Sequence, residues 1–140
     1  MYLLDTDHLS ILERGGAPSL ALTLRLSAVP ESEIVSCVVV YEEQMRGWLA
    51  QGARARTNDA WILAYSDLTD NLAVHCNMTL LPFDSRAADQ FDNLKKAKLH
   101  VGTQDLKIAA IALANEATVL TRNTRHFGKI PNLRIEDWTL

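Results

Sequence analysis

The chain has 140 residues, of which 48% are hydrophobic and 22% are charged, and its formal net charge is −3. This composition excludes disordered and fibrous proteins, and the length matches one domain with a core of its own. The slight excess of acids gives no sign of nucleic-acid binding through bulk charge. We therefore expect a single domain over residues 1–140.

Neither a membrane segment nor a disulfide framework is expected. No apolar run approaches the ~20 residues of a membrane helix, and the N-terminus lacks the basic start of a secretory signal, so we expect a cytoplasmic protein without membrane contact. Cys37 and Cys76 are too few and too poorly spaced for a disulfide framework or a zinc site. Both are expected to be buried free thiols.

Apolar runs and helical spacing alternate through the first forty residues. The pattern predicts a strand at 1–4, a helix at 8–14, a helix at 19–28 and a strand at 34–40. The second helix has helical spacing of Leu20, Leu24 and Ala28. The last run is β-branched and almost wholly apolar, which is typical of a parallel strand covered on both faces.

Residues 41–74 are predicted to form two helices paired as a hairpin. The first begins at Tyr41, and Gly52 separates it from a longer helix over about residues 53–74. The longer helix carries a row of side chains on one face: Trp61, Ala64, Tyr65 and Leu68.

The rest of the chain continues the alternation. It predicts a strand at 79–81, a helix at 86–98, a helix beginning near Thr103, a strand at 118–121 and a last strand at 133–135. Asp84 and Ser85 are typical of a helix start, and the basic end of the helix that follows suits its dipole. Alternating strands and helices in one chain predict an α/β fold, a three-layer α/β/α sandwich around a central parallel sheet.

Polar residues stand just past the predicted strands or in the first turn of a helix. They come from distant parts of the chain: Asp5, Glu43 with its neighbour Glu42, Asp105, and the pair Arg122-Asn123. In open parallel sheets, ligands bind beyond the carboxyl ends of the strands. We therefore expect these side chains to converge on one edge of the sheet.

Each acid alone has an ordinary explanation. A carboxylate in a first helical turn interacts favourably with the helix dipole, and Asp5 could serve as the N-cap of the helix that follows it. Gathered together, three carboxylates repel and raise each other's pKa, so such a cluster is stable with a cation. Hard oxygen ligands suit Mg²⁺ or Mn²⁺, and the pattern favours a metal site made by Asp5, Glu43 and Asp105.

Four stretches of the sequence resemble one family. They are LLDTDHLS, SCVVVYEEQMRG, GTQDLKIAAIALANEATVLTRN and HFGKIPNLRIEDW, and they span nearly the whole chain. They resemble the PIN domain, specifically the VapC-type toxins of type II toxin–antitoxin systems. The third stretch, in register with the others, is the most specific of them.

The resemblance implies a metal-dependent endoribonuclease with a PIN-like fold. In this family three or four acids coordinate divalent metal and cut RNA. Carried over to this chain, the acids are Asp5, Asp105 and the glutamate three residues before Gly47, which is Glu43. The adjacent Glu42 is the alternative at the second position.

The fourth family position is less regular in this chain. The family often has an acid at the position of Asn123 or three residues later, where this chain has His126. Asn123 is expected to be a weaker metal ligand or to position a water, and His126 either contacts RNA or lies on the surface. Beside Asp5, Thr6 matches the family's usual hydroxyl residue and Asp7 stands where Asn is frequent, so both are expected to support the site.

Binding partners follow from the same resemblance. Arg122 and Arg125 are candidates for phosphate contacts with an RNA substrate, such as a tRNA loop. A cognate VapB-type antitoxin would place its tail in a groove near the site, and the family commonly forms homodimers. Four side chains could line that groove or a dimer contact: Trp48, Trp61, Leu63 and Tyr65. We expect most of them to pack in the core instead.

Two other classes of protein give comparable patterns. A phosphoacceptor receiver domain also gathers acids and Mg²⁺ at strand ends, but it needs a lone Asp after a middle strand and a Lys after a late one. This chain has Glu and Arg there. A catalytically silent PIN-like module that binds RNA or protein is favoured by the missing fourth acid, and the three retained acids count against it.

Overall fold

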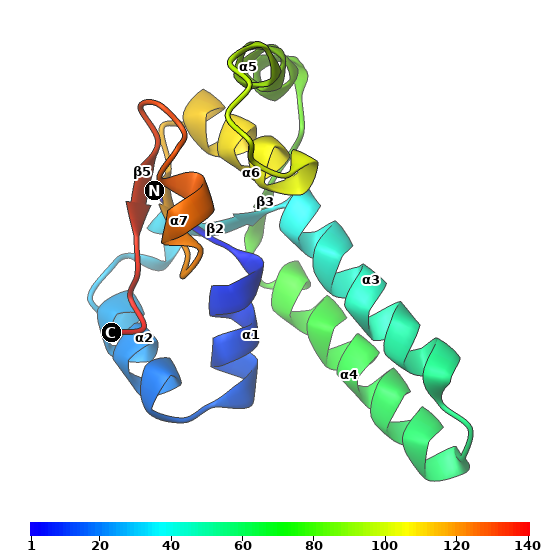
Figure 1. Cartoon of the computed structure of the whole chain (residues 1–140). Helices are drawn as coiled ribbons and strands as arrows, with labels where there is room; N and C mark the ends of the chain where they lie inside the picture. Colours follow the sequence, from blue (N-terminus) through cyan, green and yellow to red (C-terminus); the bar gives the residue numbers. More distant parts are fainter.

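The computed structural model describes residues 1–140 and confirms the predicted fold class (Figure 1). All strand pairs are parallel, and the five strands lie in the order β3-β2-β1-β4-β5. The strands are β1 (Tyr2–Leu4), β2 (Ile34–Cys37), β3 (Thr79–Leu81), β4 (Thr118–Leu120) and β5 (Arg134–Glu136).

Helices flank the sheet and pack in pairs. α1 packs against α2, α3 against α4, and α5 against α6. The α3–α4 hairpin projects away from the sheet (Figure 1). None of the helices combines the length and the apolar character that a membrane span requires. The helices are α1 (Thr6–Arg14), α2 (Ala17–Ser27), α3 (Val38–Arg54), α4 (Asn58–Cys76), α5 (Ser85–Lys96), α6 (Thr103–Ala114) and α7 (Thr124–Phe127), with a 3₁₀ turn at Glu31–Glu33.

The strand order brings the ends of β1 and β4 together. From β1 the chain adds β2 and β3 on one side and later β4 and β5 on the other, so the order reverses at β1. Leu4 is paired with Leu120, and the Asp5 N–H donates to the Leu120 carbonyl at 3.1 Å. Ligands bind in parallel sheets at such a reversal, beyond the carboxyl ends of the strands.

The core lies on both sides of the central strands. Leu3, Val35 and Val119 are fully or almost fully buried within the sheet. Helix α6 is buried from Ile108 to Ala112, as expected for a helix that is apolar on nearly every face. Asp105 lies one turn earlier in the same helix, so this packing fixes the position of its side chain at the edge of the core.

The second strand is shorter than predicted. β2 ends at Cys37, which pairs with Leu81, the last residue of β3, and the next three valines form the first turn of α3. β-Branched residues favour strands, but beyond the end of β3 an extended backbone would have no neighbouring strand on that side for its hydrogen bonds. Val39 and Val40 instead become buried on the inner face of the helix.

Helix boundaries differ from the predictions where caps decide them. α4 begins at Asn58 rather than residue 53, because the Thr57 hydroxyl accepts the Ala60 N–H at 3.2 Å as an N-cap. α5 ends at Lys96, and Lys98 already has a positive φ of 49°. The short helix α7 was not predicted, since four residues carry no periodicity.

Several burial predictions are wrong, and the peripheral position of the helices explains them. In α2 the buried leucine is Leu22, whereas Leu20 and Leu24 are exposed, because this helix packs mainly on α1. Cys37 is buried as expected, but Cys76 is exposed. On the projecting hairpin, the expected core residues Trp61, Leu63 and Tyr65 are exposed as well, while Trp48 is half-buried.

Gly128 offers a test of how the loop around α7 is held. A Cβ at this position would lie 2.5 Å from the Thr124 carbonyl oxygen, so Gly128→Ala is expected to destabilise the fold by about 1–3 kcal/mol. Gly52→Ala, inside α3, would meet nothing within 4 Å and should stabilise by about 0.5–1 kcal/mol. Urea unfolding of both variants measures this contrast, and equal stability of the two would contradict it.

Candidate functional site

Asp5 stands at the junction of β1, α1 and β4. Its Oδ1 accepts the Thr6 N–H at 2.8 Å as the N-cap of α1, and its Oδ2 accepts the Thr121 hydroxyl at 2.8 Å. The residue is only 6% exposed. Both the capping role and the predicted position at a strand end therefore apply to this carboxylate.

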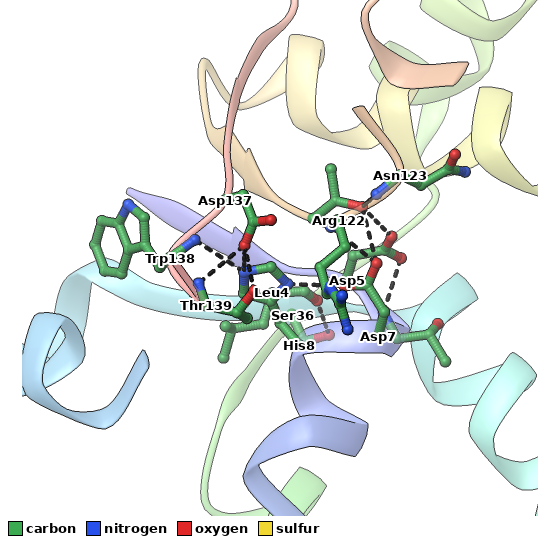
Figure 2. A network of polar contacts seen from close by, with 12 residues as sticks. Leu4, Asp5, Asp7, His8, Ser36, Arg122, Asn123, Asp137, Trp138 and Thr139 are labelled. Carbon is green, nitrogen blue, oxygen red and sulfur yellow. Dashed lines mark hydrogen bonds and ion pairs between the residues drawn. The ribbon is translucent and has the colours of Figure 1, made fainter. Parts of the chain in front are cut away.

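Asp7 lies beside Asp5 and has a partner on each oxygen (Figure 2). Its Oδ2 accepts the Arg122 backbone N–H at 2.9 Å and lies 3.3 Å from the Thr121 hydroxyl, while its Oδ1 is 2.7 Å from His8 Nδ1. Thr121 thus stands between two carboxylates. Asp7 has more contacts to distant parts of the chain than its predicted supporting role required.

Glu43, and not Glu42, faces this network. Glu43 lies in the second turn of α3, and its Oε2 accepts the Thr6 hydroxyl at 2.5 Å. Glu42 points elsewhere, to the Gln104 amide at 2.8 Å and to the Arg46 guanidinium at 3.3 Å. Of the two glutamates, only Glu43 contacts a residue next to Asp5, so it is the one that stays a candidate for the site.

Asp105 joins the network through the loop after β4. Its Oδ2 accepts the side-chain amide of Asn123 at 3.1 Å and lies 3.6 Å from Nδ1 of His126 in α7. The Asn123 backbone N–H in turn donates to the Thr121 hydroxyl at 3.0 Å. The structure therefore places His126 beside an acid of the site, a role that its sequence position left open.

Two acids at this edge have a raised pKa, and burial is the largest cause for both of them. Burial, followed by the neighbouring Asp7 carboxylate, raises the pKa of Asp5 to about 7, although its hydrogen bonds from Thr121 and Thr6 act in the opposite direction. Burial also raises the pKa of Asp105, partly offset by His126. Negative charge at this edge is poorly compensated by the protein alone.

The oxygen ligands at this edge have the chemistry that a hard divalent cation needs, but their side chains do not converge on one point. Carboxylate and amide oxygens at a strand-end edge are typical ligands of Mg²⁺ and Mn²⁺. In this arrangement Glu43 and Asp105 are turned toward Thr6 and Asn123, and no three Asp, Glu, His or Cys side chains converge on one point. The metal site therefore stays a prediction that requires these two acids to rotate toward Asp5.

The candidate RNA contacts border this edge. Arg122 and Arg125 follow β4 and have exposed side chains, so both are free to meet a phosphate. Arg122 also contributes its backbone to Asp7. Sequence reasoning missed two residues of the network, Thr121 and His8. Thr121 could have been found from its polarity directly after a buried strand, whereas the sequence pattern gave no signal for His8 inside α1.

A groove runs from the network between α1 and the α3–α4 hairpin. Near Thr6 and Glu43 it is a cavity of about 240 Å³, and a neighbouring cavity of about 450 Å³ shares Trp48 with it. Asn71 lines the second cavity, is 1% exposed, and has no hydrogen-bond partner on either amide atom. The indole N–H of Trp48 is unpartnered too. The second cavity also contains three acids: Glu13, Asp67 and Asp70.

Comparison with known proteins finds one matching family and several proteins of similar sequence. The PIN domain family matches residues 2–133. A ribonuclease VapC of Rickettsia bellii is 41% identical over 61 residues, which cover 41% of this chain and 46% of that protein, so the match spans about half of that relative. A ribonuclease VapC1 of Haemophilus influenzae strain R2866 is 26% identical over 140 residues, which cover 99% of this chain and 98% of the relative.

Solved structures share the fold across the full length. A chain of the VapBC-1 structure from nontypeable Haemophilus influenzae superposes with a TM-score of 0.77 at 22% identity, covering 99% of this chain and 98% of that one. A chain of FitAcB from Neisseria gonorrhoeae gives 0.76 at 23% identity, with coverage of 99% and 98%. At these identities the likeness concerns the fold.

The raised pKa of Asp5 predicts how stability changes with pH. Between its ordinary value of 3.8 and about 7, the folded chain holds a proton that the unfolded chain has released, so stability falls as pH rises through this window. Asp5→Asn removes the charge and should stabilise the cation-free protein at pH 8 by roughly 2–4 kcal/mol, with little gain at pH 4.

Urea unfolding at the two pH values measures this difference. Asp92→Asn, an exposed acid on α5, controls for the loss of one negative charge. A gain from Asp5→Asn that is equal at both pH values would show that the charge of Asp5 is not its source.

Proposed function

Because the chain belongs to the PIN domain family, we propose that it is the toxin of a VapBC-type toxin–antitoxin module and acts as an endoribonuclease on cellular RNA. The relatives named ribonuclease VapC support the activity, and the VapBC complexes among the similar folds support the module. The observation that carries the proposal is the network of acids around the buried Asp5, beyond the ends of β1 and β4.

We further propose that Mg²⁺ or Mn²⁺ is bound by these acids. Asp5 is the central ligand, Glu43 and Asp105 rotate from their present partners to complete the set, and Asn123 contributes a weaker neutral oxygen. A bound ion of this kind supplies an activated water and stabilises the charge that develops on the phosphate. The uncompensated negative charge around Asp5 supports cation binding at this edge.

Other residues would support the metal-binding acids or contact the RNA substrate. Thr6 and Asp7 support the acids through the contacts described above. We propose that the exposed side chains of Arg122 and Arg125 bind phosphates of the RNA, which would position it without reading its sequence. A structured RNA such as a tRNA loop is the substrate that we propose.

The silent PIN-like module is the rival function. It is favoured by the present orientation of Glu43 and Asp105, since no three acids converge on one point. Such a module would bind RNA or protein through the same surface without cutting it. Metal-dependent cleavage separates the two proposals.

We propose that the tail of a VapB-type antitoxin occupies the groove between α1 and the α3–α4 hairpin. The acids Glu13, Asp67 and Asp70 outnumber Arg14 among the charged residues that line the second cavity, which favours a basic segment. For the expected homodimer, the candidate surface consists of the exposed apolar residues of the hairpin: Leu49, Trp61, Ile62, Leu63, Tyr65 and Leu72.

Cleavage of total cellular RNA by antitoxin-free protein tests the nuclease. With Mg²⁺ or Mn²⁺ we expect discrete fragments, none with excess EDTA, and a loss of at least ~100-fold in Asp5→Asn and Glu43→Gln, since a catalytic metal contributes several kcal/mol. Glu42→Gln is the matched control on the same helix and should keep its activity. Folded wild-type protein that binds RNA but leaves it intact would favour the silent module.

Charge reversal in the groove tests the antitoxin site. Asp67→Lys combined with Asp70→Lys is expected to weaken binding of the purified VapB-type antitoxin by roughly 10-fold or more, because like charges would then oppose a basic segment. Asp92→Lys on α5 makes the same kind of change outside the groove and should bind normally. Equal affinity of all three proteins in calorimetry would place the antitoxin elsewhere.

A further inference from the structure

His8 connects the candidate site to the end of the chain. The residue is fully buried between the first turn of α1 and the segment that follows β5. Its Nδ1 lies 2.7 Å from Asp7 Oδ1, and its Nε2 accepts the backbone N–H of Trp138 at 3.3 Å (Figure 2). The contact with Trp138 joins residues 130 positions apart in the sequence.

These two contacts determine the tautomer of His8. A backbone N–H can only donate, so Nε2 carries no proton and the proton of the neutral ring stands on Nδ1. Nδ1–H therefore donates to Asp7. The Asp137 carboxylate lies 3.7 Å from Nε2, beyond hydrogen-bond distance, and its Oδ1 already accepts the Thr139 N–H at 2.9 Å and hydroxyl at 2.6 Å.

The segment that presents the Trp138 N–H is itself held firmly. The Glu136 carbonyl accepts the Thr121 N–H at 3.0 Å, which extends the pairing of β4 with β5. The Trp138 ring packs on Tyr2 with centroids 4.7 Å apart, and its indole N–H donates to the Glu136 carboxylate at 2.6 Å. The backbone donor to His8 is consequently fixed from both sides.

Asp7 passes this constraint on to the loop after β4. With Oδ1 held by His8, its Oδ2 faces the Arg122 N–H at 2.9 Å. The next residue, Asn123, carries the amide that contacts Asp105. Rotation of Asp7 would release the loop on which one proposed metal ligand and one proposed phosphate contact depend.

We propose that His8 is a positioning residue: the segment Asp137–Thr139 fixes its tautomer, its Nδ1–H orients Asp7, and Asp7 orients the Arg122-Asn123 loop toward Asp105. The structural part of this proposal rests on the contacts alone. Its consequence for RNA cleavage rests on the proposed function.

The first test needs no substitution and no activity. Ring ¹⁵N chemical shifts of His8 at pH 7 are expected to show a protonated Nδ1 and an unprotonated Nε2. A ring protonated on Nε2, alone or together with Nδ1, would overturn the proposal. Because the wild-type protein is measured, the result does not depend on whether a variant folds.

The second test compares His8→Asn with His8→Leu. The asparagine amide can stand in for Nδ1–H, whereas leucine fills the space without a donor. We expect exchange of the Arg122 amide proton to become at least ~10-fold faster in the leucine variant and to stay near the wild-type rate in the asparagine variant. Equal exchange rates in the two variants would contradict the positioning role.

RNA cleavage at saturating RNA is the third test. His8→Leu is expected to lose about 10–100-fold in kcat, the range found when outer-shell partners of a metal site are removed, and to raise KM as well, because the released loop carries both Asn123 and Arg122. His8→Asn should recover most of kcat. Losses that follow the melting temperatures of the two variants would indicate a merely structural role. If wild-type protein does not cleave RNA, the proposed function fails, while the ring shifts and amide exchange still decide the positioning role.

Discussion

The site depends on one buried carboxylate. Asp5 ends the central strand, caps the helix that follows, and accepts the hydroxyl of Thr121 from the neighbouring strand end. These bonds satisfy its oxygens but leave its charge in a desolvated place beside Asp7. A charge in such a position destabilises the fold unless a cation compensates it, and this is the physical basis of the metal site that we propose.

The elements could be predicted from the sequence because their signals are local. The alternation of apolar runs and helical spacing correctly indicated the parallel α/β sheet, and Asp5 and Asp105 were found from their places after a strand and in a first helical turn. The strand predicted over Ile34–Val40 is too long. β-Branched residues show only a preference for extended backbone, whereas the length of β2 is limited by the end of its neighbour β3.

The contacts between the elements could not be predicted in this way. Thr121 and His8 join the site only because β4 lies beside β1 and the segment after β5 folds over α1, and strand order leaves no mark on residue spacing. The same holds for the exposed aromatic side chains of the α3–α4 hairpin. Their spacing is that of a packed helix, but the hairpin projects away from the layer that would have covered them.

The sequence separation within the site has a consequence for biosynthesis. The hydrogen bond from Thr121 to Asp5 spans 116 positions, and that from Trp138 to His8 spans 130. On a ribosome, β1 cannot pair with β4 until most of the chain has been synthesised. The contact of His8 with Trp138 cannot form until almost the last residues have been added. A growing chain therefore carries the acids of the candidate site before their arrangement is complete, and the RNA cleavage that we propose would begin only when synthesis is nearly finished.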